Sequence, residues 1–396
     1  MVRGLVMTIA ALLGVATLSA QSYDQVVINR DTVTYRYTPI DQTSQAQAGV
    51  ERFGLRLNDL ITYAEDDPRS AKFSVVGGPA YSESTGWRLS AVAMLYYRTP
   101  FAPSPHSIRL GASASLKGCY AVALDGVNHF GGGHTLLYGG SFSRDRYYLY
   151  GLDYATSLGA QRGLYTMRNY EAYAHYNWRI IPNLTIGIRA DYVNKHLVSA
   201  DAFVEELVAD YAPQFSGLSV GVGVRYSTCR TQDINLTRGV VVAVEYGASP
   251  AGLNSTKGVL HTVEALLDYY QPLWRGGLLA LDLYGEYHSQ NTPWMCRAML
   301  GGDSRMRGYY YGRYNGNSLI TAQLELRQRV WEGLVVAGWG GGGMAFSEYD
   351  AAALSRVLPT YGAGLRWYFN PSSLVRIDYG FGRGCSALII GYAEAF

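Results

Sequence analysis

Charged residues are scarce in this chain: Asp, Glu, Lys and Arg make up 16% of its 396 residues, and the net charge is +2. A charge so close to zero, without any basic stripe, gives no electrostatic case for a nucleic-acid partner. After residue 20 no apolar run reaches the roughly 20 residues that a membrane-spanning helix needs. We therefore expect no nucleic-acid binding and no transmembrane helix beyond that point.

Cysteines and catalytic motifs are scarce as well. The four cysteines lack the C-x-x-C spacing of metal sites, and the sequence leaves their pairing after export open: Cys119, Cys229, Cys296 and Cys385. The seven histidines are scattered, and neither a G-x-S-x-G elbow nor a P-loop is present. Gly338, Gly340 and Gly343 formally match G-x-G-x-x-G, but inside an expected strand. We expect no catalytic residue, metal or cofactor, and hence no enzyme.

Tyrosine and glycine, by contrast, are abundant, with 34 and 46 residues. Tyrosine is enriched where a protein meets a membrane–water interface, because its ring is apolar and its hydroxyl is hydrated. Glycine at this level without a collagen repeat is typical of strongly curved sheet. The composition therefore favours a membrane protein built from strands.

Apolar and polar residues alternate in segment after segment from Lys72 to Phe396. Between Leu218 and Tyr226 every second residue is Leu, Val or Tyr, with Ser, Gly and Arg between them, and segments 184–192, 320–327 and 361–368 repeat the pattern. A strand that spans a membrane turns every second side chain to lipid and the others to the barrel lumen. About sixteen such segments predict an all-β fold, a transmembrane antiparallel β-barrel over residues 72–396.

The connections favour this barrel over a soluble β-sandwich, which can also alternate. Tight turns are expected at 181–183, 274–276, 331–333 and 370–372, in strict alternation with long connections near 144–163, 198–216, 248–260, 290–316 and 347–358. Outer-membrane barrels have short periplasmic turns and long extracellular loops. The pattern therefore places the chain in the outer membrane of a Gram-negative-type bacterium, with both ends of the barrel on the periplasmic side.

The first 71 residues divide into a signal peptide and an arm. Arg3, the apolar run from Leu5 to Thr17 and the small residues up to Ala20 predict a cleaved signal peptide over residues 1–20. Residues 21–71 are then a short periplasmic arm, polar at first, with one amphipathic helix expected over 50–64. Packing just before the first strand is the favoured place for this helix. The periplasmic mouth, the lumen and the membrane surface stay open.

The last segment carries Leu388, Ile390 and Tyr392 on one face and ends in the aromatic Phe396. Apolar residues at alternate positions before a final aromatic resemble the assembly signal of bacterial outer-membrane barrels. Glu394 departs from the apolar pattern, and we expect it in the membrane interface, where a charge costs little.

The segment 300–314, LGGDSRMRGYYYGRY, is unusual for a surface loop. A basic residue beside a glycine suits a loop tip folded back into a polar lumen, with an exposed loop as the alternative. Gly308 permits close backbone approach, and Arg307 offers five donors to a carboxylate on the wall. Glycines 338, 340 and 343 would then relieve crowding beneath something packed in the lumen.

Arg307, Gly308 and Tyr309 resemble the R-G-F/Y tip on the sixth extracellular loop of the BamA/TamA-like outer-membrane proteins, which include assembly barrels and two-partner secretion transporters. Glu325 and Arg327 match the E-x-R pattern of their next strand, and 362–367 and 376–380 are similar to their last strands. The resemblance is specific over about 300–396 and looser back to residue 72. It implies a sixth loop folded into the lumen, and a weak seam between the first and last strands.

Two features depart from that family. The arm has no room for the periplasmic POTRA domains that usually precede the barrel, so the chain resembles a short form that lacks them. The aspartate often found in strand thirteen is missing from segment 336–340. If Arg307 has a partner in the lumen, Glu325 or Asp378 must supply it, since both fall on expected inward faces.

The expected function is outer-membrane biogenesis, by insertion or translocation of proteins or by lipid remodelling, through a seam between residues 72–80 and 387–396. The alternative is a passive channel or a structural barrel without assembly activity. Expected partners are outer-membrane lipids, with client proteins or an assembly complex. The client, the specific partners and the oligomeric state stay open.

Overall fold

The computed structural model describes residues 23–28, 31–36, 72–82, 84–97, 99, 105–159, 161–231, 237–347, 354–370, 373–391 and 394–396. Within these residues the alternating segments form sixteen long strands: β3 (Lys72–Ser82), β4 (Gly86–Tyr97), β5 (His106–Ser115), β6 (Tyr120–Phe130), β7 (His134–Leu149), β8 (Gly163–Ile181), β9 (Leu184–Ala200), β10 (Gln214–Ser227), β12 (Thr237–Ser249), β13 (Leu260–Trp274), β14 (Gly277–His288), β17 (Ser318–Trp331), β18 (Leu334–Phe346), β19 (Leu358–Asn370), β20 (Ser373–Gly382) and β21 (Cys385–Gly391).

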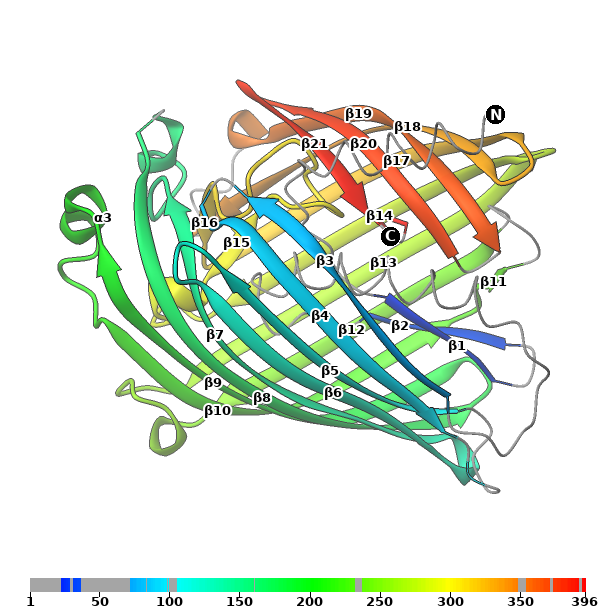
Figure 1. Cartoon of the computed structure of the whole chain (residues 1–396), viewed down its shortest axis with the longest axis horizontal. Helices are drawn as coiled ribbons and strands as arrows, with labels where there is room; N and C mark the ends of the chain where they lie inside the picture. The colour runs from blue at the N-terminus through cyan, green and yellow to red at the C-terminus, as the bar shows by residue number, and fades with distance from the viewer. Residues whose placement is uncertain are drawn as a thin grey trace.

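These strands make one closed antiparallel barrel, in which each long strand lies next to its neighbour in the chain and β21 lies beside β3 (Figure 1). The expected barrel of about sixteen strands is confirmed. Fifteen junctions have a defined register, from sixteen residue pairs between β7 and β8 down to seven between β20 and β21. A two-residue strand, β11 (Arg230–Thr231), pairs with β12. The sixteenth junction brings the last strand beside the first.

The two faces of the strands have opposite polarity. On β10, Val222 is 54% exposed to the outside, and on β17, Leu324 is 47% exposed beside the fully buried Glu325. Apolar side chains thus cover the outside while charged side chains fill the inside, the reverse of a soluble protein. This arrangement is typical of strands in contact with lipid.

Within the described residues, helical structure is confined to the connections between strands. The one α-helix in the described part of the chain is α3 (Ala202–Leu207), whose N-cap Asp201 accepts a hydrogen bond from the amide of Val204. Within the same residues, no helix has the length and apolar character needed to cross a membrane.

The connections follow the expected pattern over most of the chain. Two-residue turns join β8 to β9, β13 to β14, β17 to β18 and β19 to β20, and long loops occupy 150–162, 201–213, 250–259, 289–317 and 347–357. The expectation of strict alternation was wrong at five connections. On the long-loop side 83–85, 116–119 and 383–384 are short, and on the turn side the connections 98–105 and 228–236 are eight and nine residues long. At the three short loops the strand pairing continues to Ser82–Gly86, Ala114–Tyr120 and Gly382–Cys385, so a few residues close each hairpin.

The arm is described only in part. Strands β1 (Tyr23–Ile28) and β2 (Asp31–Arg36) pair with each other in an antiparallel hairpin. The signal peptide over 1–20 and the helix over 50–64 lie outside the described residues, and both stay predictions.

Buried apolar side chains gather inside the barrel mouth and near its base. One cluster joins α3 to the loop before β17 through Val204, Val208, Trp294 and Met295. A second surrounds Met306, Tyr309 and Tyr314. The core of this protein is therefore a set of loops packed within the ring of strands.

Candidate functional site

The sixth connection on the long-loop side, residues 289–317 between β14 and β17, folds into the barrel, and we refer to it as loop 6. Its short strands β15 (Ala298–Leu300) and β16 (Tyr314–Gly316) pair with each other and carry the tip inward. Gly301, Gly302 and Gly308 have φ values of 116°, 121° and 109°, in the left-handed region that glycine adopts without strain. Met306, at φ 51°, follows that path without being glycine.

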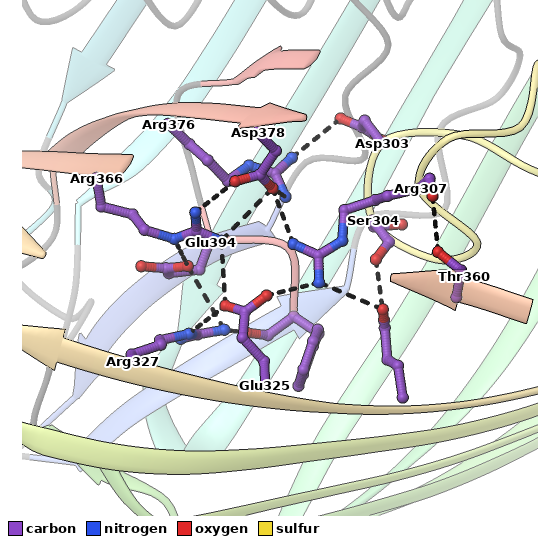
Figure 2. Close-up of polar contacts among 12 residues, drawn as sticks. Asp303, Ser304, Arg307, Glu325, Arg327, Thr360, Arg366, Arg376, Asp378 and Glu394 are labelled. Carbon is purple, nitrogen blue, oxygen red and sulfur yellow. Dashed lines mark hydrogen bonds and ion pairs between the residues drawn. The ribbon is translucent and has the colours of Figure 1, made fainter. Parts of the chain in front are cut away.

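Arg307 lies at the centre of the tip and is fully buried. Its guanidinium donates to Asp378 Oδ2 on β20 at 2.8 Å, to Glu325 Oε2 on β17 at 2.6 Å and to Gln323 Oε1 at 3.4 Å (Figure 2). The sequence offered Glu325 or Asp378 as a partner, and Arg307 binds both at once. A planar guanidinium can do this because its donors point in several fixed directions.

Trp339 on β18 completes the surroundings of Arg307. The guanidinium carbon lies 3.7 Å from the centre of a Trp339 ring, a cation–π contact in a desolvated place. Trp339 stands within segment 336–340, where the resembling family often has an aspartate. An aromatic face therefore contacts the guanidinium beside its two acids.

Three further arginines neutralise the two acids. Arg366 on β19 donates to Glu325 Oε1 at 3.1 Å and is ion-paired with Asp378, and Arg327 donates to Glu325 Oε1 at 2.6 Å. Arg376 on β20 lies 3.3 Å from Asp378 Oδ2. Each acid is therefore held from the wall of the barrel as well as from the loop.

Two more ion pairs bind the tip to the wall. Arg305 donates from Nε to Asp282 Oδ1 on β14 at 2.7 Å and from Nη2 to Oδ2 at 2.6 Å. Its guanidinium carbon lies 4.2 Å from the centre of the Tyr284 ring. Asp303 lies 3.6 Å from Arg376. The tip is thus bound to β14, β17, β18 and β20 by charged or aromatic contacts.

The buried charges balance in number. Five arginines and five carboxylates form this cluster: Arg305, Arg307, Arg327, Arg366, Arg376, Asp282, Asp303, Glu325, Asp378 and Glu394. Desolvating ten charges is costly, and the cost is offset only when every charge is paired with good geometry. Loss of one member therefore leaves an opposite charge uncompensated, which makes the docked loop sensitive to single substitutions.

The backbone of the tip fits directly against β20. A Cβ added at Gly308 would lie 2.8 Å from the carbonyl carbon of Phe381, and one added at Gly380 would lie 2.7 Å from that of Arg307. Thr360 Oγ1 on β19 also donates to the Arg307 carbonyl at 2.6 Å. Glycine at both positions is needed for main chain to meet main chain.

Tyr309, the third residue of the R-G-Y tip, is held by contacts of its own. Its ring covers Gly382, and its hydroxyl donates to the Pro359 carbonyl at 2.8 Å and accepts from the Arg383 amide at 2.6 Å. Burial raises the pKa of Tyr309 to about 12, so the hydroxyl keeps its proton and donates at neutral pH. The R-G-Y tip is therefore held at each of its three residues.

The outer half of loop 6 crosses to the opposite side of the mouth. Trp294 is buried against Tyr165 on β8, with ring centres 5.5 Å apart, and Asn315 Nδ2 donates to the Gly151 carbonyl at 2.7 Å. Tyr310 lies between Tyr148 and Tyr150, 6.0 and 6.1 Å from their ring centres. Loop 6 therefore spans the lumen from one wall to the other.

The described residues of the expected assembly signal lie on both faces of the barrel. Leu388 and Ile390 pair with the outward Tyr379 and Ile377, so they share the outer face as expected, while Tyr392 lies outside the described residues. Phe396, in contrast, is only 6% exposed. The chain leaves β21 after Gly391 and ends in the lumen.

Phe396 and Glu394 hold the end of the chain inside the lumen. The Phe396 ring packs against Tyr270, Leu278 and Ala280 near the base, and its main-chain oxygen accepts from Arg327 Nη2 at 3.1 Å. Glu394 lies 3.3 Å from Arg366 Nε and 3.5 Å from Arg327 Nη2. The interface position expected for Glu394 was therefore wrong, because buried arginines attract it inward.

The sequence did not single out Trp339, Arg366, Arg376 or the Arg305–Asp282 pair as site residues. Inward-facing polar positions next to the E-x-R and R-x-D patterns were the available signal for the arginines. The expectation that glycines lie under a packed segment was right for Gly343, where a Cβ would be 2.9 Å from Met306 Sδ. It was wrong for Gly340, which faces outward with nothing within 4 Å.

Among the described residues no set of three or more His, Cys, Asp or Glu side chains could hold a metal ion, and the four cysteines are free thiols. What the arrangement can do is structural: it holds a loop inside a barrel by charge pairing.

No family model and no curated protein matches the chain. Among solved structures, BamA from Haemophilus ducreyi lacking POTRA domains 1–3 aligns with 81% of this chain and 69% of its own, at 15% identity and TM-score 0.56. CdiB from Acinetobacter baumannii aligns with 79% of this chain and 56% of its own (14% identity, TM-score 0.51), and CdiB from Escherichia coli with 81% and 60% (13%, 0.52). The chain spans less than two thirds of either CdiB chain. It has the barrel fold of BamA and CdiB, as the resemblance implied.

Proposed function

We propose that this chain is an outer-membrane barrel that takes part in outer-membrane biogenesis, inserting or translocating proteins or remodelling lipids at the junction between β21 and β3. The observation that carries the proposal is the docked loop 6, whose tip is ion-paired to the wall through Arg305 and Arg307. Transport through the lumen would need this loop to leave its buried ion pairs. The proposal includes no catalytic step.

The outer-membrane location is supported by the outward apolar face and by the BamA and CdiB fold. Trp274 and Trp331, which immediately precede two-residue turns, are 55% and 68% exposed. Exposed tryptophans at one end of the strands suit the membrane–water interface, where an amphipathic ring is stable. An export signal over residues 1–20 would deliver the chain there.

The role of the β21–β3 junction is supported by the weakness of the strands that form it. β21 has only seven residues, and its register with β20 is the shortest of the fifteen defined. β3 contains Gly77, Gly78 and Pro79. Glycine lowers strand stability, and proline within a sheet is confined to edge strands and bulges because it lacks an amide hydrogen. A weak junction could exchange strands or lipid with its surroundings.

The test is a set of disulfides that lock this junction. Paired cysteines along β3 and β21 are introduced into a chain whose four native cysteines are serine. Cells depleted of the natural chain are complemented with each variant, and outer-membrane proteomics and lipid asymmetry are measured with and without reductant. We expect loss of function when the junction is locked and recovery on reduction.

A matched lock across a stable junction is the control. Val244 and Ala265 are direct partners on β12 and β13 and face outward, so cysteines there should cross-link without loss of function. Planar-bilayer conductance of the unlocked chain should be small. A large steady conductance, with function indifferent to the lock, would instead identify a passive channel. Unchanged function in locked chains of low conductance would show that the junction is not used and would overturn the proposal.

A further inference from the structure

Two arginines on the outer face of the barrel are placed directly opposite each other. Arg144 on β7 and Arg168 on β8 are cross-strand partners, and β7 and β8 lie side by side (Figure 1). Their neighbours Ser143, Asp145 and Asn169 are buried inside, so both arginines face outward. Side chains at such positions start about 5 Å apart.

This placement is electrostatically unfavourable in the protein alone, because like charges directly opposite on a sheet destabilise it. No ion pair joins either arginine to a described carboxylate: the acid beside Arg144, Asp145, pairs inward with Arg88. Arg144 donates to the Gly118 carbonyl at 2.7 Å, which holds its side chain but does not neutralise its charge. Arg146, two residues further along the same face, adds a third positive charge about 7 Å away.

Aromatic side chains lie immediately below these arginines. Phe142 and Tyr170 are the next outward pair on β7 and β8, with rings stacked 4.5 Å apart, and Tyr120 on β6 lies 5.5 Å from Phe142. Further down β6, the outward Val122 and Leu124 are 46% and 43% exposed. The outer face therefore changes from aliphatic to aromatic to cationic along the strands.

The height of the arginine pair matches a membrane boundary. At the other end of the same two strands, His134 and Trp178 are partners with stacked rings, ten residues along β7 from Arg144. Ten residues of strand rise about 33 Å. A strand tilt of about 40° reduces this to about 25 Å across the membrane, the height of the apolar band of outer-membrane barrels. Arg144 and Arg168 thus lie where lipid headgroups begin.

We propose that Arg144 and Arg168, with Arg146, bind the phosphate groups of an anionic lipid in the outer leaflet, whose acyl chains lie along Phe142, Tyr170 and the aliphatic surface below. A phosphate accepts bidentate hydrogen bonds from guanidinium groups and cancels the repulsion between the two arginines. The inference rests on the proposed membrane location but not on the activity of the β21–β3 junction.

The experiment measures binding of diphosphoryl lipid A to the purified barrel in neutral detergent by native mass spectrometry. The variant is Arg144→Gln/Arg168→Gln. We expect about 30-fold weaker binding, since each basic side chain at an anionic lipid surface contributes roughly fivefold. Millimolar inorganic phosphate should fail to displace the lipid, because it lacks the acyl chains.

The control variant removes two positive charges from the other end of the barrel. Arg230 and Arg238 are also direct cross-strand partners and are exposed, but they lie on the turn side, and Arg230→Gln/Arg238→Gln should bind lipid A like the natural chain. Equal loss in both double variants, or full displacement by inorganic phosphate, would overturn the proposal. So would unchanged affinity of the Arg144/Arg168 variant.

A second measurement separates lipid binding from a structural role. Arg168 makes no other described polar contact, so Arg168→Gln should raise the melting temperature in lipid-free detergent by relieving repulsion, while it weakens lipid binding. A lower melting temperature would show that Arg168 serves the fold and contradict the proposal. Normal heat-modifiable migration of each variant shows that the barrel, and with it the membrane location, is intact.

Discussion

Arg307 illustrates how one side chain can hold a whole loop. Two carboxylates from different strands and one aromatic ring surround its guanidinium. Glu325 and Asp378 are shared with Arg327, Arg366 and Arg376, so each pair depends on its neighbours. Such networks are not additive, and removing one partner of a buried pair typically costs more than the pair contributes over an apolar replacement.

Replacing Arg307 with Ala should release the tip without unfolding the barrel. The uncompensated charge and the lost pairs should weaken docking by about 3 to 5 kcal/mol. Arg307→Lys keeps the charge but cannot reach both acids with a planar fork, so its effect should be intermediate. Limited proteolysis within 289–317 is the measurement.

Cys296 on loop 6 offers an independent measure of the same release. Burial raises its pKa to about 11, so the folded thiol is protonated and unreactive below that pH. Release to water should lower the pKa toward its ordinary value near 9 and raise thiolate reactivity at about pH 8 roughly a hundredfold. The other three cysteines are replaced by serine, and Lys257→Ala, an exposed cation on another loop, is the control. Equal reactivity in the Arg307 and Lys257 variants would contradict the role of Arg307.

Phe396 gives a second prediction at the level of one residue. Because its ring packs inside against Tyr270 and Leu278, Phe396→Ala should lower the stability of the barrel by about 3 kcal/mol through the cavity it leaves. The amount of chain that reaches the outer membrane should stay normal. Thermal unfolding in detergent and membrane fractionation measure the two effects. A normal melting temperature with failed assembly would restore the outward assembly signal.

Loop 6 packs directly on β20, because the two main chains are in contact at Gly308 and Gly380. The distances at Gly308 and Gly380 leave no room for a Cβ, since the atoms in the way are backbone and cannot rotate aside. Side chains then add charge pairing to a contact that backbone shape already makes specific.

Gly380→Ala should therefore displace the tip as strongly as Arg307→Ala, although it removes no charge. Gly252→Ala in loop 250–259 is the matched control, since nothing lies within 4 Å of a Cβ there, and it should be neutral. Cys296 labelling reports both. Should Gly380→Ala leave Cys296 protected, the backbone contact would not be needed for docking.

At the level of the whole molecule, closure of the sheet removes its edges. All backbone groups of a closed barrel are paired within it, so thermal disruption needs many hydrogen bonds to break at once. The inward charge cluster and the loops that fill the mouth further link strands far apart in the sequence.

The natural chain should consequently fractionate with the outer membrane and migrate differently on gels with and without boiling. Its mature form should begin at or near Gln21, which N-terminal sequencing can measure. Recovery as a soluble periplasmic protein, with migration independent of heating, would contradict both the location and the closed barrel.

The sequence by itself determined the strands and their two faces. Alternation is a local property, because successive side chains of a strand point to opposite sides whatever the strand pairs with. Segments such as 218–226 and 320–327 therefore carry their own orientation. The polar inside followed from the same rule, since Glu325 and Arg327 alternate with apolar residues.

Only the tertiary structure decided which inward groups meet. Trp339, Arg366 and Asp378 lie on three different strands, and their heights depend on the stagger between strands, which no single segment encodes. The same holds for Phe396: its local pattern continues the outer face, but Arg327 and Arg366 draw the adjacent Glu394 inward and the ring follows. A periodic pattern specifies direction, whereas partners are chosen by the closed ring, where residues far apart in the chain compete for the same buried charges.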